Sequence, residues 1–317
     1  GGVNILIGGD AGKSLTSGAE NIAIGYGALD SSTVGNFNIA IGSSALGALD
    51  TAGSDDGDSN VAIGNSAGMS ATSMDGAVLI GHEAGKAITT GDSNVFVGTY
   101  SGAATTTGTM NVGLGHRALA TNIDGDGSVA IGHEALRFLE PSDGHTNNTA
   151  VGFGAGKNTT TGTSNTTIGT QAGTNMTTGG NNAALGANAL LLNNVGTDNV
   201  AVGQSSLSAN VDGSKSVAVG TSSLESQDPS GAADMYNVAI GHEAGQSVTT
   251  GITNTVVGGL AGDTLTTGSG NTALGYGAGF SAVGAANQTV IGYSAVGHGD
   301  NIVTIGNAAI TAIHPGD

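Results

Sequence analysis

Histidine, glutamate and aspartate are the residues of this sequence that could do chemistry, and several recur in fixed patterns. Three histidines are followed directly by glutamate, none of them within the His-Glu-x-x-His pattern of helical zinc sites: His82-Glu83, His133-Glu134 and His242-Glu243. His116 precedes His133 by 17 residues. In a repeat of that length their imidazoles would be neighbours, and copies around a shared axis could bind a transition metal. A solvated turn in which Arg117 pairs with Glu134 is the simpler interpretation, and both stay open.

Two acidic clusters have a composition typical of calcium loops. One contains Asp55, Asp56 and Asp58 around a glycine, and the other contains Asp124 and Asp126. Neither matches the twelve-residue calcium loop or the glycine-rich nonapeptide array. Calcium therefore stays an open hypothesis at these residues, and no other cofactor is expected.

The sequence offers no nucleophilic constellation. It contains no cysteine, and its serines lack a patterned histidine and aspartate nearby. A polysaccharide-cleaving β-solenoid would need two carboxylates about 5–9.5 Å apart in a groove. The acidic residues instead cluster in loops, without a repeated aromatic platform. We therefore expect a protein that is not an enzyme.

The elements that position these residues come from one repeat. The motif Asn-(Val/Ile/Thr)-Ala-(Ile/Val/Leu)-Gly recurs eighteen times, and thirteen of the seventeen spacings between its glycines are 17 residues. A fixed period over a whole chain indicates stacked supersecondary units. The sequence therefore predicts an all-β, parallel β-solenoid of eighteen coils, forming one continuous domain over residues 1–317. The first motif is in register by Asn4, as expected for a fragment of a longer fibre.

Composition narrows the classes of function. Glycine supplies 59 of 317 residues and aromatics only 3%, so small aliphatic side chains must fill a thin interior. The net charge of −18 argues against nucleic-acid binding, which needs clustered lysine and arginine. The sequence has neither a signal-peptide pattern nor an apolar run long enough to cross a membrane, so no membrane insertion is expected.

The strand motif predicts two apolar faces. In residues 199–203 we expect Val200 and Val202 to face the interior of the coil and Ala201 to face outward. The middle residue is apolar in sixteen of eighteen coils, and a strand that is apolar on both faces is usually buried on both. The outer face then needs a partner, which indicates a homo-oligomer wound about a shared axis; a wide monomeric solenoid is the alternative. The asparagine, present in thirteen coils, predicts a structural amide ladder.

A longer period is superimposed on the coils. The three enlarged spacings follow Gly42, Gly132 and Gly220, once every five coils. The residue four after the motif glycine alternates between glycine and leucine with the same beat. The enlarged loops, at residues 43–59, 137–147 and 224–236, are either recognition loops or plain surface elaboration. Their acidic recognition candidates are Glu140, Asp143, Glu225, Asp228 and Asp234.

The motif also resembles a known family. Residues 21–29 (Asn-Ile-Ala-Ile-Gly-Tyr-Gly-Ala-Leu) and 271–279 (Asn-Thr-Ala-Leu-Gly-Tyr-Gly-Ala-Gly) are similar to the head repeats of YadA-type trimeric autotransporter adhesins. They look even more like the repeats of phage tail fibres. Residues 304–313 resemble the segment that in tail fibres often precedes a C-terminal chaperone domain.

This resemblance implies a left-handed parallel β-roll, a homotrimer, surface display and adhesion. YadA-type heads usually have fourteen residues per coil, and no stalk or anchor is visible here, which favours the fibre interpretation. We therefore expect a structural and adhesive segment, most like a phage tail fibre shaft that displays a receptor-binding tip at the virion surface. The alternative is a bacterial cell-surface adhesin or extracellular filament subunit. Its expected partners are its own copies and a host-surface glycan or protein receptor.

Overall fold

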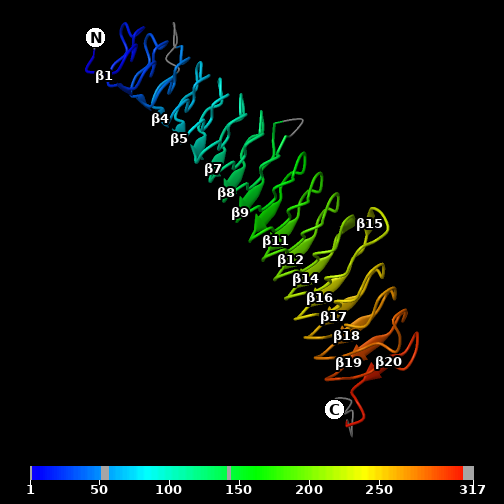
Figure 1. Ribbon diagram of the computed structural model, residues 1–317. Coiled ribbons are helices and arrows are strands. Elements are labelled where there is room, and N and C mark those ends of the chain that lie inside the picture. The colour runs from blue at the N-terminus through cyan, green and yellow to red at the C-terminus, as the bar shows by residue number, and fades with distance from the viewer. Residues whose placement is uncertain (1, 51–56, 141–143, 310–317) are drawn as a thin grey trace, which may run out of the picture. The chain divides into compact units, whose positions relative to one another are not determined.

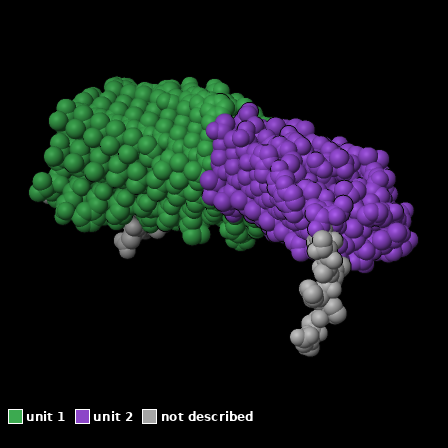
Figure 2. All heavy atoms as spheres, turned by 90° about the horizontal axis from the view of Figure 1, so that it is seen from below, with its two compact units in different colours: residues 1–164 green, residues 165–317 purple. Residues whose placement is uncertain are grey.

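The computed structural model describes residues 2–50, 57–140 and 144–309. The protein is all-β, with twenty short strands wound into parallel solenoid coils and no helix within these three ranges. The predicted fold class is confirmed. The chain divides into two compact units, residues 1–164 and 165–317, which Figure 2 colours separately.

The first unit is built from nine three-residue strands, each paired in parallel with the next along the chain (Figure 1). The register places equivalent residues over one another, so that Ile22 faces Ile39. The strands are β1 (Ile5–Ile7), β2 (Ile22–Ile24), β3 (Ile39–Ile41), β4 (Val61–Ile63), β5 (Val78–Ile80), β6 (Val95–Val97), β7 (Val112–Leu114), β8 (Val129–Ile131) and β9 (Thr149–Val151).

The second unit repeats this arrangement with nine further coil strands and one additional pair. The additional pair, β13 with β15, joins the third enlarged loop to the coil before it. The coil strands are β10 (Thr166–Ile168), β11 (Ala183–Leu185), β12 (Val200–Val202), β14 (Val217–Val219), β16 (Val238–Ile240), β17 (Thr255–Val257), β18 (Thr272–Leu274), β19 (Thr289–Ile291) and β20 (Val303–Ile305), and the pair is β13 (Gly213–Ser214) and β15 (Ala233–Asp234).

Glycine has different roles at the two corners of the coil. The motif glycine Gly81 has a φ of 135°, a conformation that side chains disfavour. Gly108, ten residues after the motif glycine Gly98, lies at the second corner of the coil and is not among the residues with positive φ. A Cβ on Gly108 would instead lie 2.6 Å from the carbonyl oxygen of Gly125 in the next coil. Close stacking of the coils, not backbone twist, therefore requires glycine at the second corner.

The two faces of each strand are the reverse of those predicted. Ala201, the middle residue of β12, is fully buried, whereas Val200 and Val202 are only partly buried. The same buried middle position recurs in every coil strand from β2 to β19. Alanine occupies this inner position in ten of the sixteen coil strands from β2 to β19, and the first and third residues of each strand face outward.

The residue four positions after the motif glycine is glycine in some coils and leucine in others, and this choice adjusts the side-chain volume in the interior. Leu119 and Gly102 occupy equivalent positions, with φ of 52° and 57°, and Leu119 is fully buried. A Cβ on Gly102 would overlap the ring of Phe96, which occupies a middle strand position usually held by alanine. Glycine therefore occurs at this position where a larger core side chain, here Phe96 of the same coil, already fills the interior.

The predicted asparagine ladder is confirmed. Asn254 Nδ2 donates to the carbonyl of Gly268 at 2.8 Å, and Asn254 Oδ1 accepts the backbone N–H of Asn271 at 3.0 Å. Where serine replaces asparagine, another side chain continues the ladder: Gln227 accepts from Ser216 at 3.2 Å and from Asn237 at 2.9 Å. These amides satisfy the buried polar groups of the corners.

Candidate functional site

The outer face of the strand ladder is largely apolar. It is formed by the first and third residues of each coil strand, and none of these positions carries a charge. The third residue is Ile, Leu or Val in all eighteen coils. Leu274 is 48% exposed and Ile240 is 42% exposed. A sheet face that is covered by water usually carries polar residues. We call this largely apolar surface the outer ladder.

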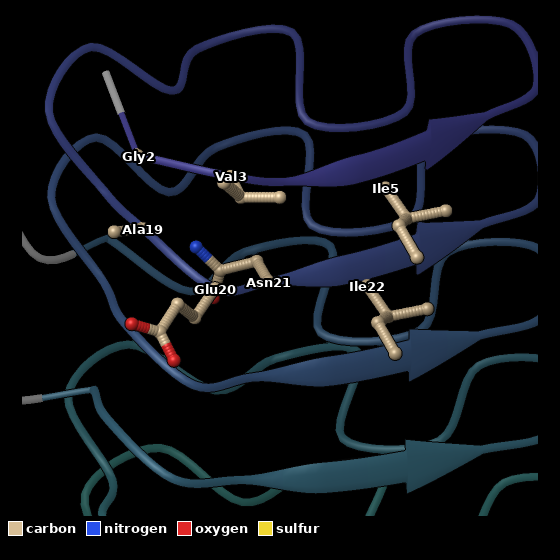
Figure 3. Close-up of a pocket in the computed structure, with 7 residues that line it drawn as sticks. All are labelled: Gly2, Val3, Ile5, Ala19, Glu20, Asn21 and Ile22. Carbon is tan, nitrogen blue, oxygen red and sulfur yellow. The ribbon is translucent and has the colours of Figure 1, made fainter.

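The outer ladder is visible at the first two coils. Ile5 on β1 and Ile22 on β2 lie one above the other and point to the same side (Figure 3). They line a shallow, mainly apolar hollow together with Val3 and the corner residues Ala19 and Glu20. This hollow belongs to the outer ladder and contains a single carboxylate.

A second feature is a column of rings in coils five to nine of the first unit. Each ring contacts the next: His82 and Tyr100 have centroids 5.4 Å apart, and Tyr100 and His116 are 6.3 Å apart. His116 stacks on His133, and His133 on Phe153, both at 5.1 Å. The column lies just after the motif glycines, on the segment that leaves the outer ladder.

Cations gather beside these rings. Glu134 Oε1 lies 2.6 Å from Arg137 and 4.0 Å from Arg117, and Glu134 Oε2 lies 2.7 Å from Lys157. The hydrogen bond from Lys157 lowers the pKa of the Glu134 carboxyl; partial burial opposes this effect, and the Arg137 charge adds to it. In the first coil of the column, Lys86 Nζ lies 3.1 Å from Glu83 Oε1. The predicted pairing of Arg117 with Glu134 is thus present, but it is the longest of three.

The sequence predicted that His116 and His133 are neighbours, but it did not predict the other rings of this column. Tyr100 lies one residue later in its coil than the histidines, and Phe153 has a different side chain, so neither extends the histidine pattern. Aligning all coils on the motif glycine and marking the six cations would have revealed the cluster. Within the part of the chain that the structure describes, no three histidine, aspartate or glutamate side chains come close enough to hold a metal ion.

The acidic residues considered for calcium have other contacts where the structure describes them. Asp58 Oδ1 accepts the backbone N–H of Asn36 at 2.6 Å, and Asp126 Oδ1 accepts that of Thr109 at 2.6 Å. These carboxylates join successive coils at one corner. Asp124 is exposed. The remaining candidates, Asp55 and Asp56, lie outside the described residues.

The recognition candidates do not converge on one site. Glu140 and Asp228 are exposed and bond the next coil through their backbone N–H groups. Glu225 accepts from the amide of Gln246 at 2.7 Å. Asp143 lies outside the described residues.

Asp234 forms the most developed contact of the loop candidates. Lys215 Nζ lies 2.7 Å from Asp234 Oδ2 and 5.3 Å from the centre of the Tyr236 ring. The hydrogen bond between Lys215 and Asp234 raises the pKa of the lysine and lowers the pKa of the aspartate. This exposed pair fastens the third enlarged loop to the coil before it.

Two broader findings complete the description. Over the described ranges, the protein has no helix that could span a bilayer. No protein-family model and no curated protein matches the sequence.

Proposed function

We propose that this chain is a structural and adhesive fibre segment, most like the shaft of a phage tail fibre that displays a receptor-binding tip. The outer ladder carries the proposal. In each unit it is a largely apolar face without charge, and its presence in successive coils fits a surface that is covered by copies of the same chain. The proposed assembly is a homotrimer.

The coil architecture supports a mechanical role. Parallel strand pairs join successive coils, and the asparagine ladder and the corner carboxylates add bonds between several of them, so stiffness arises from nearest-neighbour bonds. These features serve equally well in a bacterial cell-surface adhesin or filament subunit, which remains the alternative. Either protein would be displayed outside the cell or on a virion, where it would meet a host glycan or protein receptor.

The absence of an enzymatic role is part of the proposal. The carboxylates best placed to act, Glu134 and Asp234, are each engaged by lysine at 2.7 Å. A polysaccharide-degrading activity that is lost on replacing a single loop carboxylate would contradict the fibre role.

Electron microscopy of the purified chain tests this function. We expect unbranched particles of constant width that lengthen when further coils are added, because each coil contacts only its neighbours. Antibody labelling should place the chain along a fibre of the parent particle or cell. Compact particles that do not lengthen would refute the proposal.

A further inference from the structure

The ring column and its cations form one surface strip that contrasts with the rest of the molecule. The chain has only six lysine and arginine residues and a net charge of −18. Four of the six lie in coils five to nine, at positions that follow the motif glycine by two or five residues: Lys86, Arg117, Arg137 and Lys157. We call these four cations, with the rings His82, Tyr100, His116, His133 and Phe153, the basic strip.

The backbone fixes the spacing of the strip. The N–H of Glu134 donates to the carbonyl of His116 at 2.9 Å, and the N–H of Arg117 to that of Thr99 at 3.0 Å. On the other side, the N–H of Phe138 donates to the carbonyl of Lys157 at 3.1 Å. Equivalent positions therefore repeat at the separation of parallel strands, about 4.8 Å per coil. The cations occur in coils five, seven, eight and nine, and those of coils eight and nine, Arg137 and Lys157, occupy equivalent positions one coil apart.

The cationic groups are held in place before any ligand arrives. The guanidinium carbon of Arg137 lies 4.6 Å from the centre of the Phe138 ring, and that of Arg117 lies 5.8 Å from the Tyr100 ring. Glu134 meets one nitrogen of Arg137, whereas a guanidinium carries five N–H donors. Preorganised groups lose less conformational entropy on binding.

The internal ion pairs do not neutralise the strip. Two acids face its four cations, Glu83 beside Lys86 and Glu134 beside the other three. The remaining positive charge is confined to a few coils. Four cation side chains are each 25–40% exposed, so a ligand can reach them from solvent.

The chemistry of the strip selects one class of ligand. Arginine binds carboxylates through paired N–H groups, and ring atoms such as those of Phe153, 55% exposed, pack against apolar sugar faces. Duplex nucleic acid is disfavoured because it carries one negative charge per about 1.7 Å of helix axis, which the strongly acidic remainder of the chain repels more than it repels one carboxylate per sugar. We propose that the basic strip binds an acidic polysaccharide that carries a carboxylate on successive sugars. The inference deepens the adhesive role proposed above and rests on it.

Binding of an oligogalacturonate long enough to span five coils tests the inference. The test variant is the double replacement Lys86→Gln/Arg117→Gln, which leaves the Arg137 and Lys157 pairs with Glu134 intact. The matched control is Lys13→Gln/Lys215→Gln, which removes the same charge elsewhere. Lys13 is especially suitable because it occupies the Lys86 position in the first coil and also pairs with the acid three residues earlier.

We expect the wild-type chain to bind the oligogalacturonate with an affinity that falls as salt rises, and not to bind its methyl ester. The test variant should lose about tenfold or more in affinity, because two charge-assisted contacts are removed. The control should bind like the wild type. Circular dichroism would confirm that all three proteins are equally folded.

Several results would overturn the inference: no binding to the oligogalacturonate, equal binding of its methyl ester, or equal losses in test variant and control. Duplex DNA that binds the strip as tightly as the oligogalacturonate would refute the assigned ligand class. The solution mass of the same sample separates this inference from the proposed function. A trimer that fails to bind refutes only the ligand, whereas a monomer that binds refutes only the fibre.

Discussion

Replacing Gly81 with alanine is expected to lower the free energy of unfolding by more than about 4 kcal/mol. Gly81 has a φ of 135°, and a Cβ there would lie 2.6 Å from the carbonyl oxygen and 2.7 Å from the carbonyl carbon of Gly98. Both obstacles are backbone atoms of the next coil, so no side-chain rotation relieves them. The coils would have to separate and lose hydrogen bonds on either side.

Gly76→Ala, five residues earlier in the chain, is the matched control. Gly76 also has a positive φ, of 62°, but a Cβ there would meet nothing within 4 Å. Its equivalents include Ser93 and Met110, which tolerate the same left-handed backbone. The expected cost is about 1–2 kcal/mol. Urea unfolding followed by circular dichroism compares the two, and equal costs would show that coil stacking does not impose the motif glycine.

Replacing Asn254 with alanine is expected to cost about 3–5 kcal/mol, because it removes the buried partners of two backbone groups at about 1–3 kcal/mol each, together with an amide of the ladder. The groups left without Asn254 are the carbonyl of Gly268 and the N–H of Asn271. The side chain of Asn271, which donates to Asn254 Oδ1 at 3.0 Å, also loses that acceptor.

Gln204→Ala provides the control for Asn254→Ala. Gln204 is an exposed amide in the same unit, and its loss should change the free energy of unfolding by no more than about 0.5 kcal/mol. Thermal unfolding of both variants measures the difference. If Asn254→Ala were as mild as the control, the asparagine ladder would not stabilise the coils.

The sequence was sufficient to predict the solenoid because the period is independent of side-chain orientation. The glycine spacing determines the coil, and the asparagine pattern determines its ladder. The predicted orientation of the strand faces was wrong because Ala201 and its valine neighbours are all apolar. Valine is more often buried than alanine, which favoured the prediction that the valines face the interior. Which face of the strand is buried depends on how the rest of the coil packs against it, and the strand pattern alone does not contain that information.

Other details depended on contacts between distant positions. Gln227 accepts a hydrogen bond from Ser216, which stands where most coils have asparagine, and so continues the ladder. The two residues are eleven positions apart, and no periodic signal connects them. The ring column crosses from one coil position to another at Tyr100, so a strict register obscures it. The acidic loop candidates were conspicuous in composition, whereas the basic strip was visible only after the coils were stacked.

The reversed faces strengthen the argument for an oligomer. In the proposed oligomer, the covered face carries isoleucine, leucine and valine at most positions instead of alanine, and would therefore offer a larger apolar area for association. Its first position also admits threonine, as at Thr255 and Thr272. Threonine replacing Val200 should accordingly be tolerated in the assembly, whereas aspartate should not, because a charge would be buried without a partner.

Sedimentation equilibrium of the wild-type chain, with Val200→Asp and Val200→Thr beside it, tests most directly whether copies of the chain cover the outer ladder. The expected mass of the wild type and of Val200→Thr is three times that of the 30.2 kDa chain, with Val200→Asp shifted toward smaller species. A monodisperse wild-type particle of 30.2 kDa would contradict the fibre assembly, because its outer ladder would then be stable in water.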